Sequence, residues 1–295
     1  MKKVLALVLA LVLVLAAFAG CSKDPAPSGD ATTAAPTGEK IEIAVPNDTT
    51  NEARALILLE KLGVITLKEG AGITATVLDI VDNPFNVEIK EVEAAQIPNV
   101  LQDVDYGIIN SNYAISAELN PAEDALSLEG AYSAYSNIIA VKEGNENSSK
   151  TKALIAALES KKVADFITEK YSGSVLSVVE NPGDGFAADV NYSELAGSTI
   201  TVAASPTPHA EILAVAKEIL AEKDITLEVT EFTDYVQPNN VVDSGDIDAN
   251  YFQHAPYLDN FNAENGTKLV NVASIHVEPL GIYGGKQTTL DALTK

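Results

Sequence analysis

Several residue types are scarce in this chain of 295 residues, and each scarcity excludes a class of structure. The single cysteine excludes any disulfide within the chain. There is no tryptophan and only one methionine. The three histidines, His209, His254 and His276, are far apart in the sequence. Their spacing matches no local zinc motif, so we expect no metal site.

Motifs of the common enzyme classes are also missing. The sequence has no Gly-x-Ser-x-Gly elbow, no Walker motif and no cysteine nucleophile beyond Cys21. Residues 70–75 resemble a dinucleotide fingerprint, but they precede a predicted strand instead of following one and opening a helix. An enzyme would need a nucleophile–base pair, and the sequence offers only one candidate, His254. We therefore expect a protein that is not an enzyme and has no cofactor.

Positive charge is scarce as well. The chain has 19 Lys and Arg against 42 Asp and Glu, which gives a formal net charge of −23. Such a surface repels nucleic acid and anionic lipid headgroups. The charge therefore excludes nucleic-acid partners and favours solubility, but it does not indicate a ligand.

A long hydrophobic run occurs only at the start of the chain. Lys2 and Lys3 precede an apolar run over 4–19, which ends at Gly20 and Cys21. A positive segment, a short apolar run and a small-residue site are typical of a signal peptide. The alternative is a transmembrane anchor, for which the run is short because a bilayer span needs roughly 20 residues. The sequence predicts a signal peptide over 1–20.

The residues that follow the signal peptide predict a lipid anchor and a tether. Cys21 stands where bacterial lipoproteins are acylated, with Phe18 in place of the usual aliphatic residue. Residues 21–39 are rich in Ser, Thr, Ala, Pro and Gly, so they cannot form a core and favour a flexible tether. We expect the protein on the extracytoplasmic face of a bacterial cell membrane, anchored by lipid.

The remaining residues alternate between short β-rich runs and amphipathic helices. This alternation predicts an α/β fold with mostly parallel sheets. Strands are predicted at 41–45, 106–109, 199–204, 226–232, 248–252, 269–272 and 281–283, and short strands or strand–turn units at 73–80 and 87–92. Helices are predicted at 54–62, 96–102, 150–171 and 209–222.

Aromatic residues gather in one part of this chain. Residues 231–239 and 250–261 combine Tyr and Phe with Asn, Gln and His. Rings beside amide groups suit a small pocket with an apolar floor and a few polar orienting groups. The alternative is that these rings only fill the core, and the residues alone do not decide between the two.

Arg54 and three asparagines are candidate polar partners for a ligand. Thr49 and Glu52 form a capping-box pattern, which puts Arg54 near the positive end of a helix, where a carboxylate is favoured. A surface Arg paired with Glu52 or another acid is the alternative. Asn110 and Asn112 follow a predicted buried strand, and Asn137 precedes another. Their amide oxygens suit a ligand ammonium, although asparagines at strand ends also make turns.

Long segments resemble the methionine-binding lipoproteins, the substrate-capturing subunits of bacterial ABC importers. Segments that resemble the beginning of that family stand in the second half of this chain, at 200–213, 231–239, 248–254 and 276–283. Segments that resemble its later part stand in the first half, at 43–56, 79–84, 91–98, 109–114, 135–141 and 166–173. The resemblance therefore implies a circularly permuted order.

The family resemblance implies a two-lobed fold like that of type II periplasmic binding proteins, which closes on its ligand by a hinge. Carried onto this order, residues 40–137 plus 284–295 would form one lobe and residues 138–283 the other. The chain would cross between the lobes near Asn137 and Tyr283. Residues 177–195 would be the new joining segment between the old termini.

The resemblance also implies roles for single residues. Arg54 would hold the ligand carboxylate, with Asn110 and Asn137 at the polar end of the pocket. The side-chain pocket would be lined by Tyr235, Tyr251, Phe252 and His254. The expected ligand is methionine or a related apolar amino acid, and the expected partner is the permease of an ABC importer. A methionine-containing dipeptide as ligand and a surface lipoprotein without a transport role, such as an adhesin or antigen, are the alternatives.

Overall fold

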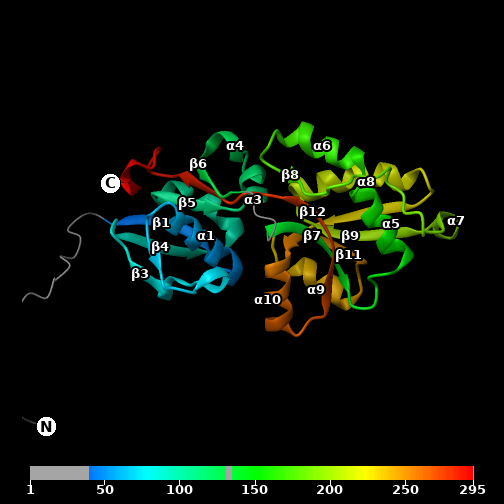
Figure 1. Ribbon diagram of the computed structural model, residues 1–295, viewed down its shortest axis with the longest axis horizontal. Helices are drawn as coiled ribbons and strands as arrows, with labels where there is room; N and C mark the ends of the chain where they lie inside the picture. The colour runs from blue at the N-terminus through cyan, green and yellow to red at the C-terminus, as the bar shows by residue number, and fades with distance from the viewer. Residues whose placement is uncertain (1–39, 131–134, 295) are drawn as a thin grey trace, which may run out of the picture. The chain divides into compact units, whose positions relative to one another are not determined.

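The computed structural model describes residues 40–130 and 135–294. Contacts divide the chain into Met1–Ala35 and Pro36–Lys295, and every described residue belongs to the second unit. The predicted signal peptide, the tether and Cys21 therefore lie outside the described residues. Two large sheets organise the described part, each with its own helices (Figure 1). Within the described ranges, no helix is both long enough and apolar enough to cross a membrane.

The first sheet has five strands in the order β4-β1-β5-β13-β6. Strand β1 lies between β4 and β5 and runs parallel to both, whereas β13 pairs antiparallel with β5 and β6. The strands are β1 (Ile41–Pro46), β4 (Val87–Val92), β5 (Tyr106–Ile109), β6 (Ala125–Leu128) and β13 (Gly281–Gly284). A separate small sheet pairs β2 (Thr66–Leu67) with β3 (Ile80–Asp82).

Helix α1 (Thr49–Lys61) packs on the first sheet. Ala53, Leu56 and Leu59 are fully buried and share a core with β1. The helix is capped by Asp48 and not by the predicted Thr49, because the Asp48 side chain accepts the Asn51 backbone N–H at 2.9 Å. This cap fixes the beginning of α1, which carries Asn51 and Arg54 into the site.

Short helices complete the first lobe, the part of the chain built around the first sheet. They are α2 (Ile97–Val100), α3 (Ser111–Ser116), α4 (Pro121–Asp124) and short 3-10 turns. The short strand or strand–turn unit predicted at 73–80 is mostly turn, since 3-10 turns precede β3, which begins at Ile80. Gly70 and Gly72 have positive φ, which interrupts an extended chain, and Ile73 is 56% exposed and has no face to bury.

The second sheet has six strands in the order β10-β9-β11-β7-β12-β8. The strands are β7 (Ser136–Lys142), β8 (Leu176–Ser177), β9 (Thr199–Ala204), β10 (Thr226–Glu231), β11 (Ala249–His254) and β12 (Leu269–Val277). β10, β9 and β11 are parallel, whereas β7 is antiparallel to β11 and β12, and β8 to β12. Both large sheets are thus mixed and not mostly parallel, because strands that enter from the other lobe run in the opposite direction.

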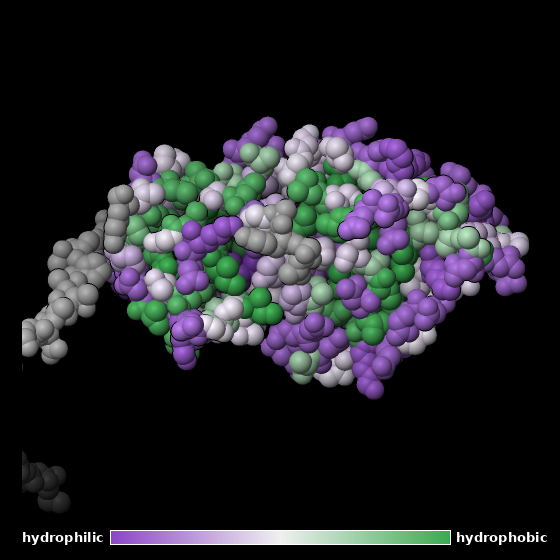
Figure 2. Space-filling view, in the orientation of Figure 1, coloured by the Kyte–Doolittle hydropathy of each residue, from purple (hydrophilic) through white to green (hydrophobic). Residues whose placement is uncertain are grey.

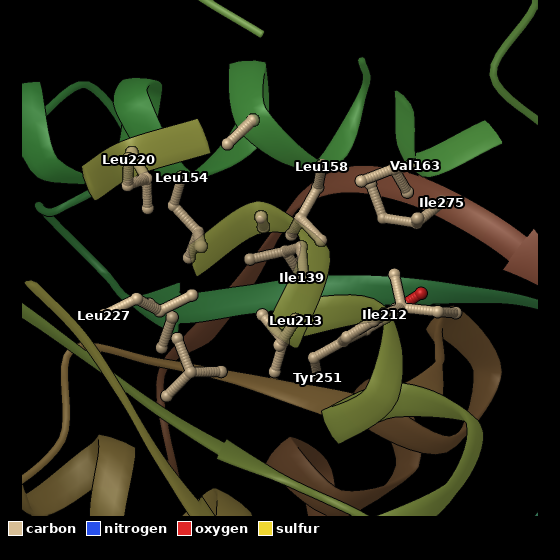
Figure 3. Close-up of a cluster of buried hydrophobic side chains, with 14 of the residues drawn as sticks. Ile139, Leu154, Leu158, Val163, Ile212, Leu213, Leu220, Leu227, Tyr251 and Ile275 are labelled. Carbon is tan, nitrogen blue, oxygen red and sulfur yellow. The ribbon is translucent and has the colours of Figure 1, made fainter. Parts of the chain in front are cut away.

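Helices cover both faces of the second sheet (Figure 1). Along β7, Ile139 and Val141 face one core while Ile138 and Ala140 face another, as expected for a strand buried on both sides. The first core is covered by α5 (Ser149–Leu158), α6 (Lys161–Tyr171) and α8 (Glu211–Ala221), as Figure 3 shows, and the second by α9 (Gln237–Ser244) and α10 (Ala255–Asn265). Hydrophilic side chains dominate the outer edge of this lobe (Figure 2).

The chain passes between the two sheets twice, from β6 to β7 and from β12 to β13. The expected crossings shift by a few residues, since Asn137 pairs with His254 inside the second sheet and Tyr283 pairs with Gly107 inside the first. Sequence could not place these boundaries, because a short apolar strand does not reveal which sheet it joins. After β13, Leu293 returns to the core that contains Ile43 of β1.

The predicted joining segment, 177–195, runs along the second lobe. It begins at β8, which pairs with β12, and ends in the short helix α7 (Tyr192–Leu195). Between them, Val190 is buried, and Phe186 and Tyr192 pack against the core under α5 and α8. The contacts of this segment thus lie with elements of one lobe.

Candidate functional site

A small pocket lies where the two lobes meet. Residues of both lobes line this pocket, so neither lobe forms it alone. The first lobe contributes Asn51, Arg54, Asn110, Ser111 and Asn112, and the second contributes Asn137, Tyr235, Phe252, Gln253, His254 and Tyr257, with Glu278 on the segment that follows β12.

Arg54 lies on α1 and is 4% exposed. Its Nε donates to Glu129 Oε2 at 2.8 Å, its Nη2 also pairs with Glu129, and Nη2 donates to the backbone oxygen of Glu278 at 2.8 Å. The guanidinium also lies 4.5 Å from the centre of the Tyr135 ring. Arg54 is therefore not a surface residue paired with Glu52, whose carboxylate instead accepts the Val77 backbone N–H. The guanidinium is held rigidly before any ligand arrives.

Asparagines form the polar part of the pocket. Asn110 lies at the end of β5 and donates from Nδ2 to Asn51 Oδ1 at 2.9 Å. Its Oδ1 is buried and has no hydrogen-bond partner among the described residues. Asn137 of β7 accepts with Oδ1 from His209 Nε2 at 2.8 Å. The amide oxygen of Asn137 is thus already used, whereas that of Asn110 still needs a donor.

Aromatic rings form the other side of the pocket. Tyr235 lies 5.8 Å from Phe252 and 5.9 Å from Tyr257, measured between ring centres, and Tyr257 packs on Phe261. Burial raises the pKa of Tyr235 well above its usual value, so its hydroxyl stays protonated. Rings packed against one another in this way present an apolar surface. The aromatic cluster predicted from the sequence thus borders the pocket as well as a core.

His254 lies between the aromatic and the polar parts of the pocket. Its Nδ1 accepts the Tyr257 backbone N–H and so caps α10, and its Nε2 lies 3.4 Å from Asn51 Oδ1. Burial, assisted by the positive charge of Arg54, lowers the pKa of His254 to about 3. The imidazole is therefore neutral, and because Nδ1 accepts, Nε2 carries the proton.

Tyr251 does not line the pocket, which corrects the role that the resemblance implied. It lies in the core of the second lobe, beside Ile139 and Leu213 (Figure 3). Its hydroxyl hydrogen-bonds to His276 Nδ1. Successive residues of a strand point to opposite faces, so when Phe252 faces the pocket, Tyr251 faces away.

The fold brings together two histidines that are distant in sequence. His209, His276 and Glu278 place ligand-type atoms within 4.8 Å of one another, and all three are buried. His276 Nε2 lies 2.9 Å from Glu278 Oε1, and His209 Nε2 lies 3.4 Å from the same oxygen. His276 hydrogen-bonds to Glu278 and His209 hydrogen-bonds to Asn137, whereas His209 Nδ1 is buried without a hydrogen-bond partner among the described residues. The local spacing on which the expectation about metals rested could not detect this group.

Burial controls the protonation of this network. It lowers the pKa of both His209 and His276 to about 3, although the carboxylate of Glu278 acts in the opposite direction on His209. Burial also raises the pKa of Glu278, while His209, Arg54 and the Asn112 backbone N–H lower it. Both imidazoles are therefore neutral at physiological pH.

Three contacts join the lobes beside the pocket. Tyr235 donates its hydroxyl to Asn112 Oδ1 at 2.7 Å, and Tyr113 donates to the Thr233 backbone oxygen at 3.3 Å. The third is the approach of His254 to Asn51. The rings of Tyr113 and Tyr235 also lie 4.9 Å apart. Four of the residues that join the lobes here, Asn51, Asn112, Tyr235 and His254, also line the pocket.

The structure brings together six of the seven residues predicted for the ligand site: Arg54, Asn110, Asn137, Tyr235, Phe252 and His254. Sequence reasoning missed Asn51, Glu129 and Glu278. Asn51 and Arg54 are three apart on one helix, so helical periodicity could have indicated Asn51. Glu129 and Glu278 are two of many acids in the chain, and no local signal distinguishes them.

The fold and the pocket define a class, a two-lobed α/β protein with a pocket where its lobes meet. The sequence profile of one family, described as NlpA lipoprotein, matches residues 33–179 and 200–295. The chain belongs to this family.

Curated relatives match over part of their length. Membrane lipoprotein TpN32 of Treponema pallidum is 46% identical over 131 residues, which are 44% of this chain and 49% of the relative. D-methionine-binding lipoprotein MetQ of Escherichia coli is 39% identical over 137 residues, 46% of this chain and 51% of the relative. The matched part spans about half the length of these relatives.

One similar solved structure is a nutrient binding protein from Burkholderia cenocepacia bound to methionine. It is 47% identical, with a TM-score of 0.45, over 46% of this chain and 58% of the other.

Proposed function

We propose that this chain is the substrate-binding subunit of a bacterial ABC importer and captures methionine or a related apolar amino acid between its lobes. The observation that carries the proposal is the pocket itself, which combines a buried guanidinium, an unpartnered amide oxygen and an aromatic wall. These groups complement the carboxylate, the ammonium and the side chain of such an amino acid. The relative named D-methionine-binding lipoprotein supports this ligand class.

In this proposal, Arg54 binds the ligand carboxylate. Two of its nitrogens, Nε and Nη2, already donate to Glu129 and Glu278. The carboxylate would therefore approach the third nitrogen, Nη1, where the charge of the guanidinium is still available. Asn110 would accept from the ammonium, and Asn137, held through its oxygen by His209, would present its amide N–H groups.

The side chain of the ligand would lie against Tyr235, Phe252, Tyr257 and His254. A thioether suits this wall, because sulfur beside an aromatic ring contributes roughly 0.3–1.5 kcal/mol. The wall carries no charge, since His254 is neutral. A charged side chain would lose its hydration there without gaining a partner.

The ligand identity can be tested on the purified protein. Denaturation followed by mass spectrometry would name any molecule that was bound, and calorimetry on the stripped protein would then compare L-methionine, D-methionine and glycylmethionine. We expect one methionine per chain, and on binding a higher melting temperature together with a smaller radius in solution scattering. Absence of any amino-acid or dipeptide ligand would favour a surface lipoprotein without a transport role.

The membrane anchor belongs to the same proposal. Cys21 would be acylated after removal of residues 1–20, and residues 21–39 would tether the lobes at the outer face of the membrane, near the permease. A relative named as a membrane lipoprotein supports this location. We expect the parent protein to incorporate labelled palmitate and the Cys21→Ala variant to incorporate none.

We also propose that the order of segments is circularly permuted. Two observations support it: β13 and Leu293 at the end of the chain join the sheet and the core that β1 begins, and each curated alignment stops at about half of the relative. A colinear alignment of a permuted chain can follow only one of the two blocks. Residues 180–199, which the family profile passes over, would then be the joint.

The permutation can be tested with a reordered chain in which residues 196–295 precede residues 40–176. If the order is permuted, this chain folds and binds the same ligand with similar affinity, because the same surfaces meet. A reordered chain that fails to fold would contradict the proposal.

A further inference from the structure

We propose that Glu278 is the counter-ion for the ammonium group of the ligand, so that the site selects amino acids with a free α-amino group. This inference rests on the proposed function and adds a residue that the sequence did not indicate. Glu278 follows β12, on the segment that leads back to the first lobe, and it lines the pocket beside Arg54 and Asn112. Its side chain is 7% exposed.

Neutral donors hold the carboxylate of Glu278 in position. The hydroxyl of Tyr251 is bonded to His276 Nδ1, and because a neutral imidazole has one donor and one acceptor, the hydroxyl donates and His276 Nε2 keeps its proton. That Nε2 donates to Glu278 Oε1 at 2.9 Å. His209 Nε2 donates to Asn137 Oδ1 and lies 3.4 Å from the same carboxylate oxygen. The network fixes the position of the carboxyl group without supplying a cation, and because burial raises the pKa of Glu278, a cation brought by the ligand would favour its ionised form.

The charges around the pocket do not balance. Among the lining residues, Arg54 carries the positive charge, and its ion pair is with Glu129. The histidines nearest to Glu278 are neutral, since burial keeps their pKa at about 3. Glu278 is thus a second buried acid beside one buried base. A buried acid without a counter-ion is unfavourable, and a cationic group brought by the ligand removes that penalty.

A second acceptor supports the same reading. Asn110 Oδ1 is buried in the pocket lining without a hydrogen-bond partner among the described residues. An ammonium group has three donors and no acceptor, so one such group can serve both oxygens. A neutral hydroxyl or amide of a ligand could satisfy Asn110 but would leave the charge of Glu278 unbalanced. The two acceptors together therefore favour an ammonium.

The test compares two ligands that differ only in this group, L-methionine and 4-(methylthio)butanoate, which lacks the ammonium. The parent protein should prefer methionine strongly. In Glu278→Gln, which keeps an oxygen for His276, methionine affinity should fall about thirtyfold or more, while 4-(methylthio)butanoate binds as well as before or better. The ratio of the affinities for methionine and 4-(methylthio)butanoate should therefore fall strongly in this variant. An unchanged preference in Glu278→Gln would overturn the inference.

Two further variants make the experiment decisive. Glu129→Gln removes the other buried acid, and the preference for methionine over 4-(methylthio)butanoate should survive in it. Glu278→Asp keeps the charge but withdraws the carboxylate, so it should weaken methionine binding without affecting 4-(methylthio)butanoate. If circular dichroism shows that Glu278→Gln does not fold, Glu278→Asp is the variant that tests the inference. An unchanged methionine affinity in Glu278→Asp would also count against the inference. A parent protein that binds neither ligand would refute the proposed function instead.

Discussion

The two sides of the pocket are held by different forces. On the polar side, Arg54, Glu129 and Glu278 are fixed by an ion pair and by hydrogen bonds to neutral groups. On the aromatic side, Tyr235 and Phe252 are fixed mainly by contacts between rings. A buried charge that loses its partner costs several kcal/mol, whereas an apolar side chain replaced at similar volume costs less than about 1.5 kcal/mol. The polar side should therefore tolerate little change and the aromatic side much more.

The largest effect is expected for Arg54→Ala. Methionine affinity should fall roughly a hundredfold or more, because the ligand carboxylate loses a charge-assisted partner. The free energy of unfolding should also fall by about 3–5 kcal/mol, because Glu129 is left as an unpaired buried charge. Calorimetry and urea unfolding measure the two effects.

A double variant separates binding from folding in that experiment. Arg54→Met with Glu129→Gln removes both charges, so it should regain much of the stability and none of the affinity. If methionine still bound within a few-fold of the parent, Arg54 would not contact the ligand.

The histidines provide the next test, because His209 and His276 lie behind the polar side and His254 beside the aromatic side. The pKa of each is lowered to about 3, below the usual 6.5. Between these values the unfolded chain binds more protons than the folded one, so their contribution to stability is complete above pH 6.5 and is lost as the pH falls towards 3. The raised pKa of Glu278 acts in the opposite direction.

Proton NMR can follow each imidazole directly. None of the three should titrate between pH 5.5 and 7.5 in the folded protein, and all should titrate near 6.5 in urea. The urea concentration at the midpoint of unfolding should decrease when the pH is lowered from 6.5 to 4.5. An imidazole that titrated near 6.5 in the folded state would contradict its burial, and the comparison of the two sides would have to be revised for that residue.

Tyr251→Phe addresses a residue behind the polar side. The missing hydroxyl leaves His276 Nδ1 buried without a donor, which should cost about 1–3 kcal/mol of stability. Methionine affinity should change by less than about threefold, since Tyr251 lies in the core of the second lobe. A large loss of affinity without a loss of stability would restore Tyr251 to the site.

The smallest effect is expected on the aromatic side, for Phe252→Leu. This change nearly conserves volume, so stability should fall by less than about 1.5 kcal/mol. Methionine affinity should fall less than about tenfold, because the contact between sulfur and the ring contributes roughly 0.3–1.5 kcal/mol. The affinity for norleucine, which lacks the sulfur, should fall less in this variant than the affinity for methionine does. Equal losses for the two ligands, measured by calorimetry, would remove sulfur recognition from the role of Phe252.

The sequence by itself determined much of the secondary structure and most of the ligand-site candidates. Strands such as β1 and β9 and the helix that carries Arg54 follow from local patterns of apolar residues, which depend only on near neighbours. Segments long enough to resemble a family indicated six pocket residues in two distant blocks. Local patterns could not decide between strand and turn at 73–80, where most residues form 3-10 turns and β3 begins at Ile80.

Only the tertiary structure decided which residues act on one another. Glu129 and Glu278 are 75 and 224 residues from Arg54, and each contacts it through a side-chain or backbone oxygen. Glu278 also joins two histidines that no local spacing connects. Because successive side chains of β11 point to opposite faces, Phe252 lines the pocket and Tyr251 lies in the core. Burial and charge pairing arise when distant segments meet, so the sequence can supply the charged residues, but only the fold selects the pairs.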